Sequence, residues 1–347
     1  MKVLCFSSFT FSYLNRARVL FQTLRRFHPD WELVALITDR APPGFLFEPE
    51  REPFDRVVWA HELGIAGFEG WLFKHDVVEA CTAVKGPFLL QACEGSGADA
   101  VIYLDPDTAL FASLEPLTAL LGDYDILLTP HLTDPNETEE AIRDNDLSAS
   151  RTGIFNLGFV AVRAGGEGLR FARWWSDRLL DWCYDEMDQG IFVDQRWCDH
   201  VPALFDRVKV VRDPGYNVAS WNLSRRKVSV GKDGAIRVNG HILRFWHFTK
   251  LGPLGDAMTR KYGGLNFPVY EIWRWYRGEV ARATEPAIPP GWWAYGVYSD
   301  GEPIAKQHRE IYRARPDLQA HFPDPFLIGD ADYFTWLAGE GLLAPAA

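Results

Sequence analysis

The sequence lacks the long hydrophobic runs that mark membrane proteins and secreted precursors. No run of about 18 apolar residues occurs in its 347 residues, and its first residues contain no basic segment followed by a long apolar one. We therefore expect neither a transmembrane segment nor a signal peptide.

Cysteine is scarce and is not arranged in pairs. The chain has 5 cysteines, an odd number, and none of them forms a Cys-x-x-Cys motif. This pattern argues against a disulfide framework and against a zinc site built from cysteines. The expected compartment is therefore the reducing cytoplasm.

Positive charge is also in short supply. The formal net charge is -11, with 36 Lys and Arg against 47 Asp and Glu. Nucleic acids and anionic lipid surfaces attract proteins through a positive field, so we expect no nucleic-acid partner. Hydrophobic residues make up 47% of the chain and charged residues 24%, which is typical of a folded globular protein.

A glycine-rich phosphate loop is absent after the first predicted strand. Residues 5–16 (CFSSFTFSYLNR) contain no glycine. Dinucleotide-binding folds and P-loop enzymes need glycines there, because the backbone must approach the phosphates closely. The same absence argues against a nucleotidyltransferase, which would need a glycine-rich loop bearing Lys or Arg.

The segments that are present predict an α/β fold. Residues 2–6, 13–27 and 32–38 read as strand, helix and strand, which favours a mostly parallel sheet flanked by helices. Further strands are expected at 56–59, 100–104, 126–129 and 155–162, and helices at 71–93, with an interruption at 86–87, and at 169–182.

The pattern changes after about residue 205. Short strands are expected at 208–211, 227–230 and 243–248, with turns at 231–234 and 239–240, followed by helices at 266–283, 303–314 and 331–341 and a loop at 286–301. We expect a catalytic domain over 1–255 and a helical extension over 256–347.

Two aspartates follow a buried strand. Asp105 and Asp107 end the run Val-Ile-Tyr-Leu-Asp-Pro-Asp, and residues two apart on a strand point to the same face. Ligands bind at such strand ends in α/β sheets, and carboxylate oxygens are preferred by Mg²⁺ and Mn²⁺. Two solvated turn aspartates would give the same local pattern.

The aspartate pair also has a second interpretation. Residues 104–110 (LDPDTAL) match the nucleophile motif of haloacid-dehalogenase-like phosphatases, in which Asp105 would be the nucleophile. That fold places the motif near the start of its core and needs a later acidic pair, for which Asp330 and Asp332 are the available residues. Here two strand–helix units precede Asp105, which disfavours this alternative.

With the aspartate pair placed, the chain resembles the GT-A glycosyltransferases, in particular the glycogenin-like retaining group and a related bacterial branch. The segments that carry the resemblance occur in the expected order at 13–30, 79–85, 101–111, 155–159, 192–197, 215–223 and 245–248. The resemblance implies a GT-A catalytic domain with a Rossmann-like, mostly parallel mixed sheet flanked by helices, followed by a helical C-terminal appendage.

The resemblance also implies roles for individual residues. Asp105, Asp107 and His247 would ligate Mn²⁺ or Mg²⁺. The residues that would face the transferred sugar are Asn156, Asp194 and Gln195. A second Asp-Gln pair, Asp188 and Gln189, lies six residues earlier and leaves that assignment ambiguous; we favour Asp194 because its segment matches better.

Lys74, Lys85 and Lys250 are the candidate contacts for the donor diphosphate. The family follows its histidine with a glycine and a lysine in another register, which puts the role of Lys250 in doubt. Phe9, Phe11 or Tyr13 would contact the nucleotide base.

The implied activity is the transfer of a hexose from a nucleotide-diphosphate donor, UDP-sugar by resemblance, with retention of configuration. The acceptor would be a saccharide, a lipid-linked glycan or a protein, as in polysaccharide biosynthesis. A noncatalytic sugar-binding module is the remaining alternative.

Overall fold

The fold is built around a seven-stranded sheet, described by a computed structural model that covers residues 1–343. Its strand order is β10-β6-β7-β4-β1-β2-β3. The strands are β1 (Val3–Phe9), β2 (Glu32–Ile37), β3 (Arg56–Trp59), β4 (Ala100–Leu104), β6 (Ile126–Pro130), β7 (Phe155–Arg163) and β10 (Val208–Val210). All run in one direction except β7, which is antiparallel to β4 and β6. The predicted mostly parallel mixed sheet is confirmed.

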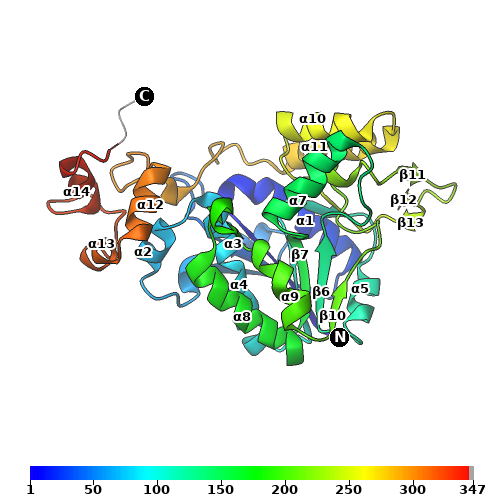
Figure 1. The fold of residues 1–347 in the computed structure, drawn as a ribbon, viewed down its shortest axis with the longest axis horizontal. Helices are drawn as coiled ribbons and strands as arrows, with labels where there is room; N and C mark the ends of the chain where they lie inside the picture. The colour runs from blue at the N-terminus through cyan, green and yellow to red at the C-terminus, as the bar shows by residue number, and fades with distance from the viewer. Residues whose placement is uncertain (344–347) are drawn as a thin grey trace.

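Alternating side chains of the strands separate two cores. Leu4 and Phe6 of β1 face one core and Cys5 faces the other, as the period of two requires. The helices α4 (Lys85–Gly95) and α8 (Gly166–Trp182) cover the first face, and α1 (Leu14–Phe27) and α5 (Glu115–Leu120) cover the second. Figure 1 shows this layering around the central strands.

The long helix predicted at 71–93 is in fact three helices. They are α2 (Phe68–Phe73), α3 (Val77–Ala83) and α4. The chain breaks at Asp76, whose carboxylate caps α3 by accepting hydrogen bonds from the backbone N–H groups of Val78 and Glu79. The interruption expected at 86–87 lies two residues earlier, at Val84, and Pro87 takes the first turn of α4, where its missing N–H costs no hydrogen bond.

The smaller pairings outside the seven-stranded sheet are antiparallel. β5 (Thr108–Leu110) pairs with β14 (Phe245–His247), so the strand expected at 243–248 is shorter than predicted. β11 (Val228–Val230), β12 (Ile236–Val238) and β13 (His241–Ile242) form the meander that the two predicted turns indicated. β8 (Asp185–Glu186) and β9 (Ile191–Phe192) form a short hairpin.

Short helices fill the connections. They are α6 (Glu139–Ala141), the π-helical turn Ile142–Asp146, α7 (Leu147–Thr152) and α9 (Val201–Leu204).

The C-terminal segment, from residue 253 onward, is helical, as predicted, but with two additional helices. Its elements are α10 (Pro253–Gly263), α11 (Phe267–Ala283), α12 (Lys306–Ala314), α13 (Pro316–His321) and α14 (Tyr333–Gly339). α10 and α13 were not expected, and both begin at a proline, which suits the first position of a helix. The boundary expected at residue 255 falls inside α10.

This C-terminal segment shares the hydrophobic core of the sheet. Tyr276 of α11 stacks on Phe248 at 3.7 Å between ring centroids. Tyr298 and Tyr312 are buried in the core that also contains α4 and α8. In Figure 1, α12, α13 and α14 gather at one end beside α2, and α10 and α11 lie at the other. The division into two domains stays a prediction.

Two expectations concern the whole chain. All 5 cysteines lie in the described part, none is in a disulfide, and Cys5, Cys93, Cys183 and Cys198 are buried. Within residues 1–343 the helices are too short or too polar to cross a bilayer.

Candidate metal centre

Asp105, Asp107 and His247 meet at the carboxyl edge of the sheet. Asp105 follows the last residue of β4, and its carbonyl accepts a hydrogen bond from the Thr108 N–H at 3.1 Å, which turns the chain into β5. β14 then places His247 directly opposite Thr108. One ligand atom from each of the three side chains lies within 4.8 Å of the others. The predicted metal ligands are therefore close together.

The imidazole of His247 faces both carboxylates. Its Nε2 lies 3.1 Å from Asp107 Oδ1 and 3.5 Å from Asp105 Oδ2, and the ring is 4% exposed. Its Nδ1 lies 3.2 Å from Asn156 Oδ1, an atom that can only accept. Nδ1 therefore carries a hydrogen, and the lone pair of Nε2 is available to a cation in the neutral ring.

The electrostatics of this cluster favour a positive charge at its centre. Burial opposes protonation of His247, but the carboxylates of Asp107 and Asp105 outweigh burial and raise its pKa. Burial likewise opposes ionisation of Asp107, yet His247 and Arg16 hold its pKa below the ordinary value. Two carboxylates and one imidazole are a donor set that suits a divalent ion such as Mn²⁺ or Mg²⁺.

Asn156 contacts Nδ1 of His247, while Nε2 of the same ring faces the aspartates. Its Oδ1 also accepts hydrogen bonds from Asn217 Nδ2 at 3.0 Å and from the Gly158 N–H at 3.2 Å, and its Nδ2 lies 3.3 Å from His131 Nε2. The amide is thus engaged with protein atoms on both ends. The predicted contact between Asn156 and the transferred sugar stays a prediction.

Gly158 is required by this close packing. A Cβ at this position would lie 2.6 Å from His247 Cε1 and 2.8 Å from Asn156 Oδ1. Any other residue would push the histidine away from the aspartates.

Lys85 links the aspartate pair to Asp194. Its ammonium donates to Asp105 Oδ1 at 3.2 Å, to Asp194 Oδ2 at 2.9 Å and to the Leu157 carbonyl at 3.3 Å, and the residue is 3% exposed. Burial opposes the charge, but the two carboxylates raise its pKa above the ordinary value. Asp105 is further fixed by the Tyr103 hydroxyl, 2.6 Å from Oδ1. The role predicted for Lys85 as a diphosphate contact stays untested.

Asp194 and Asp188 occupy contrasting positions. Asp194 is 2% exposed, and burial raises its pKa although Lys85 acts in the opposite direction. Asp188 lies in the exposed turn between β8 and β9. Gln195 is buried, and its amide donates to the Thr152 carbonyl at 2.8 Å. The geometry brings Asp194, and not Asp188, to the metal cluster through Lys85.

The aromatic candidates of the first loop differ in exposure. Phe9 and Phe11 are each 1% exposed and belong to the core. Tyr13 is 37% exposed, and the guanidinium of Arg16 lies 4.0 Å from the centre of its ring. Among the three, Tyr13 is the residue whose ring is open to a ligand.

The remaining lysines lie outside the cluster. Lys74 ends α2, where burial lowers its pKa and the carboxylate of Asp181 acts against this shift. Lys250 is exposed, with φ of 55°, in the loop between β14 and α10. Asp332, part of the acidic pair that a phosphatase would need, caps α14 by accepting from the Thr335 N–H at 2.6 Å. No observation therefore favours the phosphatase alternative.

Sequence reasoning missed several neighbours of the metal cluster. They are Arg16, Tyr103, His131 and Asn217. Tyr103 could have been found, because it lies only two residues before Asp105, near the end of β4. Arg16 and Asn217 come from distant segments that no local spacing connects to the aspartates.

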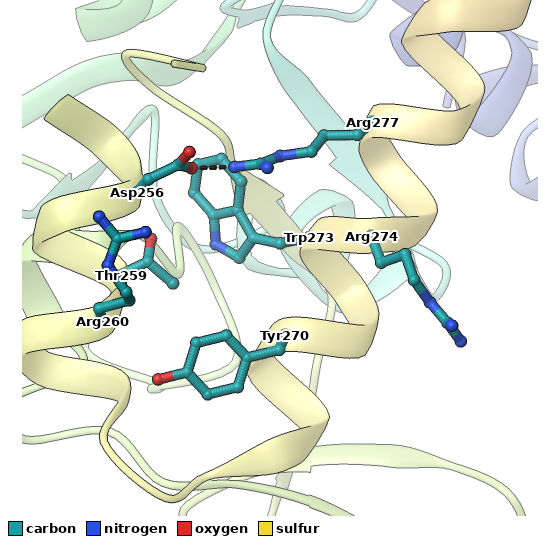
Figure 2. Close-up of a pocket in the computed structure, with 7 residues that line it drawn as sticks. All are labelled: Asp256, Thr259, Arg260, Tyr270, Trp273, Arg274 and Arg277. Carbon is teal, nitrogen blue, oxygen red and sulfur yellow. Dashed lines mark hydrogen bonds and ion pairs between the residues drawn. The ribbon is translucent and has the colours of Figure 1, made fainter. Parts of the chain in front are cut away.

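A separate cavity of about 350 Å³ lies between α10 and α11 (Figure 2). It is lined by Asp256, Thr259, Arg260, Tyr270, Trp273, Arg274 and Arg277. Figure 2 shows Arg277 paired with Asp256 above the Trp273 ring, while Arg274, which pairs with Glu271, points away from the cavity. We do not include these residues in the candidate metal centre.

No family model matches the sequence. Two curated proteins of Bacillus subtilis (strain 168) are similar to it, and both are described as uncharacterized. YfnF is 31% identical over 178 residues, which are 50% of this chain and 57% of YfnF, so the chain spans little more than half of that protein. YfnD is 27% identical over 253 residues, which are 70% of this chain and 78% of YfnD.

Three solved structures of similar fold are glycosyltransferases. The galactosyltransferase LgtC, in complex with donor and acceptor sugar analogs, has 16% identity and a TM-score of 0.46 over 84% of this chain and 98% of its own. Mouse xyloside xylosyltransferase 1 has 15% identity and a TM-score of 0.41 over 73% and 98%. The glycosyltransferase GlyE of Streptococcus pneumoniae TIGR4 has 14% identity and a TM-score of 0.39 over 83% and 65%. The fold of this chain rests on its own strand order and directions.

Proposed function

We propose that this protein is a metal-dependent glycosyltransferase that moves a sugar from a nucleotide-diphosphate donor to a hydroxyl acceptor. The observation that carries the proposal is the convergence of Asp105, Asp107 and His247 next to the Lys85–Asp194 ion pair. A cation site beside a buried carboxylate is the arrangement needed to hold a diphosphate on one side and a developing positive charge on the sugar on the other.

The three ligands would hold Mn²⁺ or Mg²⁺. When bound, the ion would neutralise negative charge that builds on the leaving nucleoside diphosphate. Asn156 keeps the Nε2 of His247 turned toward the aspartates, and Lys85 together with Tyr103 fixes the orientation of Asp105. These contacts preorganise the ligands before the donor arrives.

Asp194 would stabilise the positive charge that develops on the transferred sugar. As the glycosidic bond breaks, positive charge grows at the anomeric carbon, and a nearby carboxylate lowers the energy of that state. Its burial strengthens this electrostatic effect because water does not screen it. The resemblance favours attack by the acceptor on the face that the diphosphate leaves, which retains the configuration.

Tyr13 would stack on the base of the nucleotide, since its exposed ring lies at the start of α1. We propose a UDP-sugar as donor and a glycan or protein as acceptor.

The test is a panel of nucleotide sugars incubated with the purified protein and MnCl₂, with release of the nucleoside diphosphate as readout. We expect turnover of one donor in the presence of Mn²⁺ and none after EDTA. Binding of a donor should also raise the melting temperature. Turnover that continues in EDTA, or donor binding with no transfer or hydrolysis under any acceptor condition, would contradict the proposal; the second result would favour a sugar-binding module.

A further inference from the structure

The two oxygens of Asp107 face different partners. Oδ1 faces His247 and the metal cluster, whereas Oδ2 lies 3.9 Å from Nη1 of Arg16, in the first turn of α1. This distance is too long for a hydrogen bond. Nη1 has no hydrogen-bond partner within residues 1–343, although the atom is shielded from water. A buried guanidinium N–H without a partner is costly, so its place beside the metal cluster needs an explanation.

The guanidinium is held in place by an aromatic ring. It lies 4.0 Å from the centre of the Tyr13 ring, a distance at which a cation is attracted to the ring face. The Arg16 side chain keeps 16% of its surface exposed. The ring therefore restricts the guanidinium, and the Arg16 side chain is not fully enclosed by protein.

Two of the lysines that were predicted to contact the diphosphate are less suited to binding it. Lys85 is 3% exposed and already donates to two carboxylates and one carbonyl. Lys74 lies beside Asp181. A planar guanidinium also matches two phosphate oxygens at once, whereas an ammonium acts as a point charge.

We propose that Arg16 binds the diphosphate of the donor, on the side of the metal cluster that Asp107 Oδ2 faces. The inference rests on the proposed function, and it assigns to α1 a contact that the sequence resemblance expected from lysines. Tyr13 and Arg16 then act together: the ring takes the base, and the guanidinium at its face takes the phosphates. A cation held by Asp107 and His247 would add to the positive charge around the diphosphate.

The experiment is calorimetric titration of UDP, and separately of inorganic pyrophosphate, into the protein with MnCl₂. We expect Arg16→Gln to weaken both ligands by about 10-fold or more, because a charge-assisted bidentate contact is lost from each. Arg16→Lys should recover only part of the affinity, because it restores the positive charge but not the paired N–H donors of the guanidinium. The matched control is Arg26→Gln, an exposed arginine on the same helix, which should bind both ligands like the wild type.

Unchanged affinity for UDP and pyrophosphate in Arg16→Gln would overturn the inference, and so would a loss confined to Lys250→Gln. Failure of the wild type to bind any nucleoside diphosphate with metal would instead overturn the proposed function. Melting curves of the ligand-free variants show whether a loss of affinity comes from unfolding. If Arg16→Gln is unfolded, the affinity of Arg16→Lys for UDP and pyrophosphate decides the question instead.

Discussion

Asp107 is more deeply buried than Asp105 and lies between a histidine and an arginine. We predict that Asp107→Asn lowers turnover by about 100-fold or more, because it removes one charge from the cation site without changing the size of the side chain. EDTA should reduce the wild type to the same level. The measurement is initial rate against MnCl₂ concentration, with circular dichroism to confirm the fold. A variant that regains wild-type turnover at saturating Mn²⁺ would show that Asp107 is not essential.

We predict that the burial of His28 makes the free energy of unfolding depend on pH. The backbone N–H of Leu114 donates to its Nε2 at 2.8 Å, and burial lowers its pKa to about 4 from the usual 6.5. Because the unfolded chain takes up the proton first, this contribution to stability is present above pH 6.5 and is lost as the pH falls toward 4. The loss should be on the order of 2 kcal/mol, less than the full change in pKa would give, because solvent screens part of the effect.

Urea unfolding of His28→Gln between pH 7.5 and 4.5 tests this prediction. Glutamine can accept the same N–H but does not titrate, so the free energy of unfolding should fall less steeply with decreasing pH than in the wild type. The exposed His321→Gln variant is the control and should follow the wild type. An identical slope in His28→Gln would contradict the prediction.

At the scale of elements, the hairpin of β8 and β9 separates two similar Asp-Gln pairs. It exposes Asp188 at its turn and directs the chain back so that Asp194 reaches Lys85. We predict that Asp194→Asn loses most of the rate but still binds the nucleotide, whereas Asp188→Asn stays close to the wild type. Donor hydrolysis and nucleotide titration on both variants measure this. If Asp188→Asn were the slower enzyme, the assignment would be reversed.

The loop that contains Trp292 and Trp293 packs on the end of β2. The indole N–H groups donate to the carbonyls of Arg40 at 2.9 Å and Thr38 at 3.2 Å, and the guanidinium of Arg309 lies 4.9 Å from the Trp293 ring centre. We predict that Trp293→Ala costs about 2–4 kcal/mol and reduces all activities together, because a half-buried ring and its hydrogen bond are lost.

Trp182→Ala is the control, since Trp182 is 52% exposed. Thermal melts and acceptor KM are the readouts. A raised acceptor KM in Trp293→Ala with an unchanged melting temperature would assign the loop to acceptor binding instead.

Local pattern predicted the elements well where periodicity and burial agree. The strands at 100–104 and 126–130 and the helix at 267–283 lie within a residue or so of their expected positions. The helix expected at 71–93 was wrong, because the chain breaks at 74–76, where the Asp76 cap was the available sequence signal, and again at Val84. Helix α10 was missed because its short polar sequence is held by tertiary contacts, such as the Lys261 ion pair with Asp144.

At the scale of the whole molecule, some contacts of the candidate site follow from short spacing in the sequence and others depend on tertiary packing. Asp105 and Asp107 are close in sequence, and the turn between β4 and β5 brings their carboxylates together. The approach of His247 was predicted only through resemblance, because it depends on the pairing of β14 with β5. The bridging position of Lys85 between two carboxylates depends on the packing of α4 under the sheet, which no spacing in the sequence reveals.

Aromatic side chains of the C-terminal segment pack against the rest of the chain in the structure. Phe248 packs between Trp273 and Tyr276, and Tyr298 and Tyr312 are buried with the sheet. We predict that a chain ending at residue 255 fails to unfold cooperatively, since it exposes this apolar surface and cuts α10. Calorimetry of the shortened chain measures this, and a sharp transition near that of the full chain would show that 1–255 is an independent domain.

The reactivity of the enclosed cysteines can report how often the structure opens locally. Burial raises the pKa of Cys81 and of Cys93 to about 12 and that of Cys198, which lies under the Asp194 carbonyl, well above its usual range. Alkylating reagents react with thiolates, so modification of Cys198 requires that the chain around Asp194 opens. The rate at which Cys198 is alkylated therefore reports how often the chain around Asp194 opens. A slower rate in the presence of nucleotide and Mn²⁺ would measure how far a bound ligand suppresses this opening.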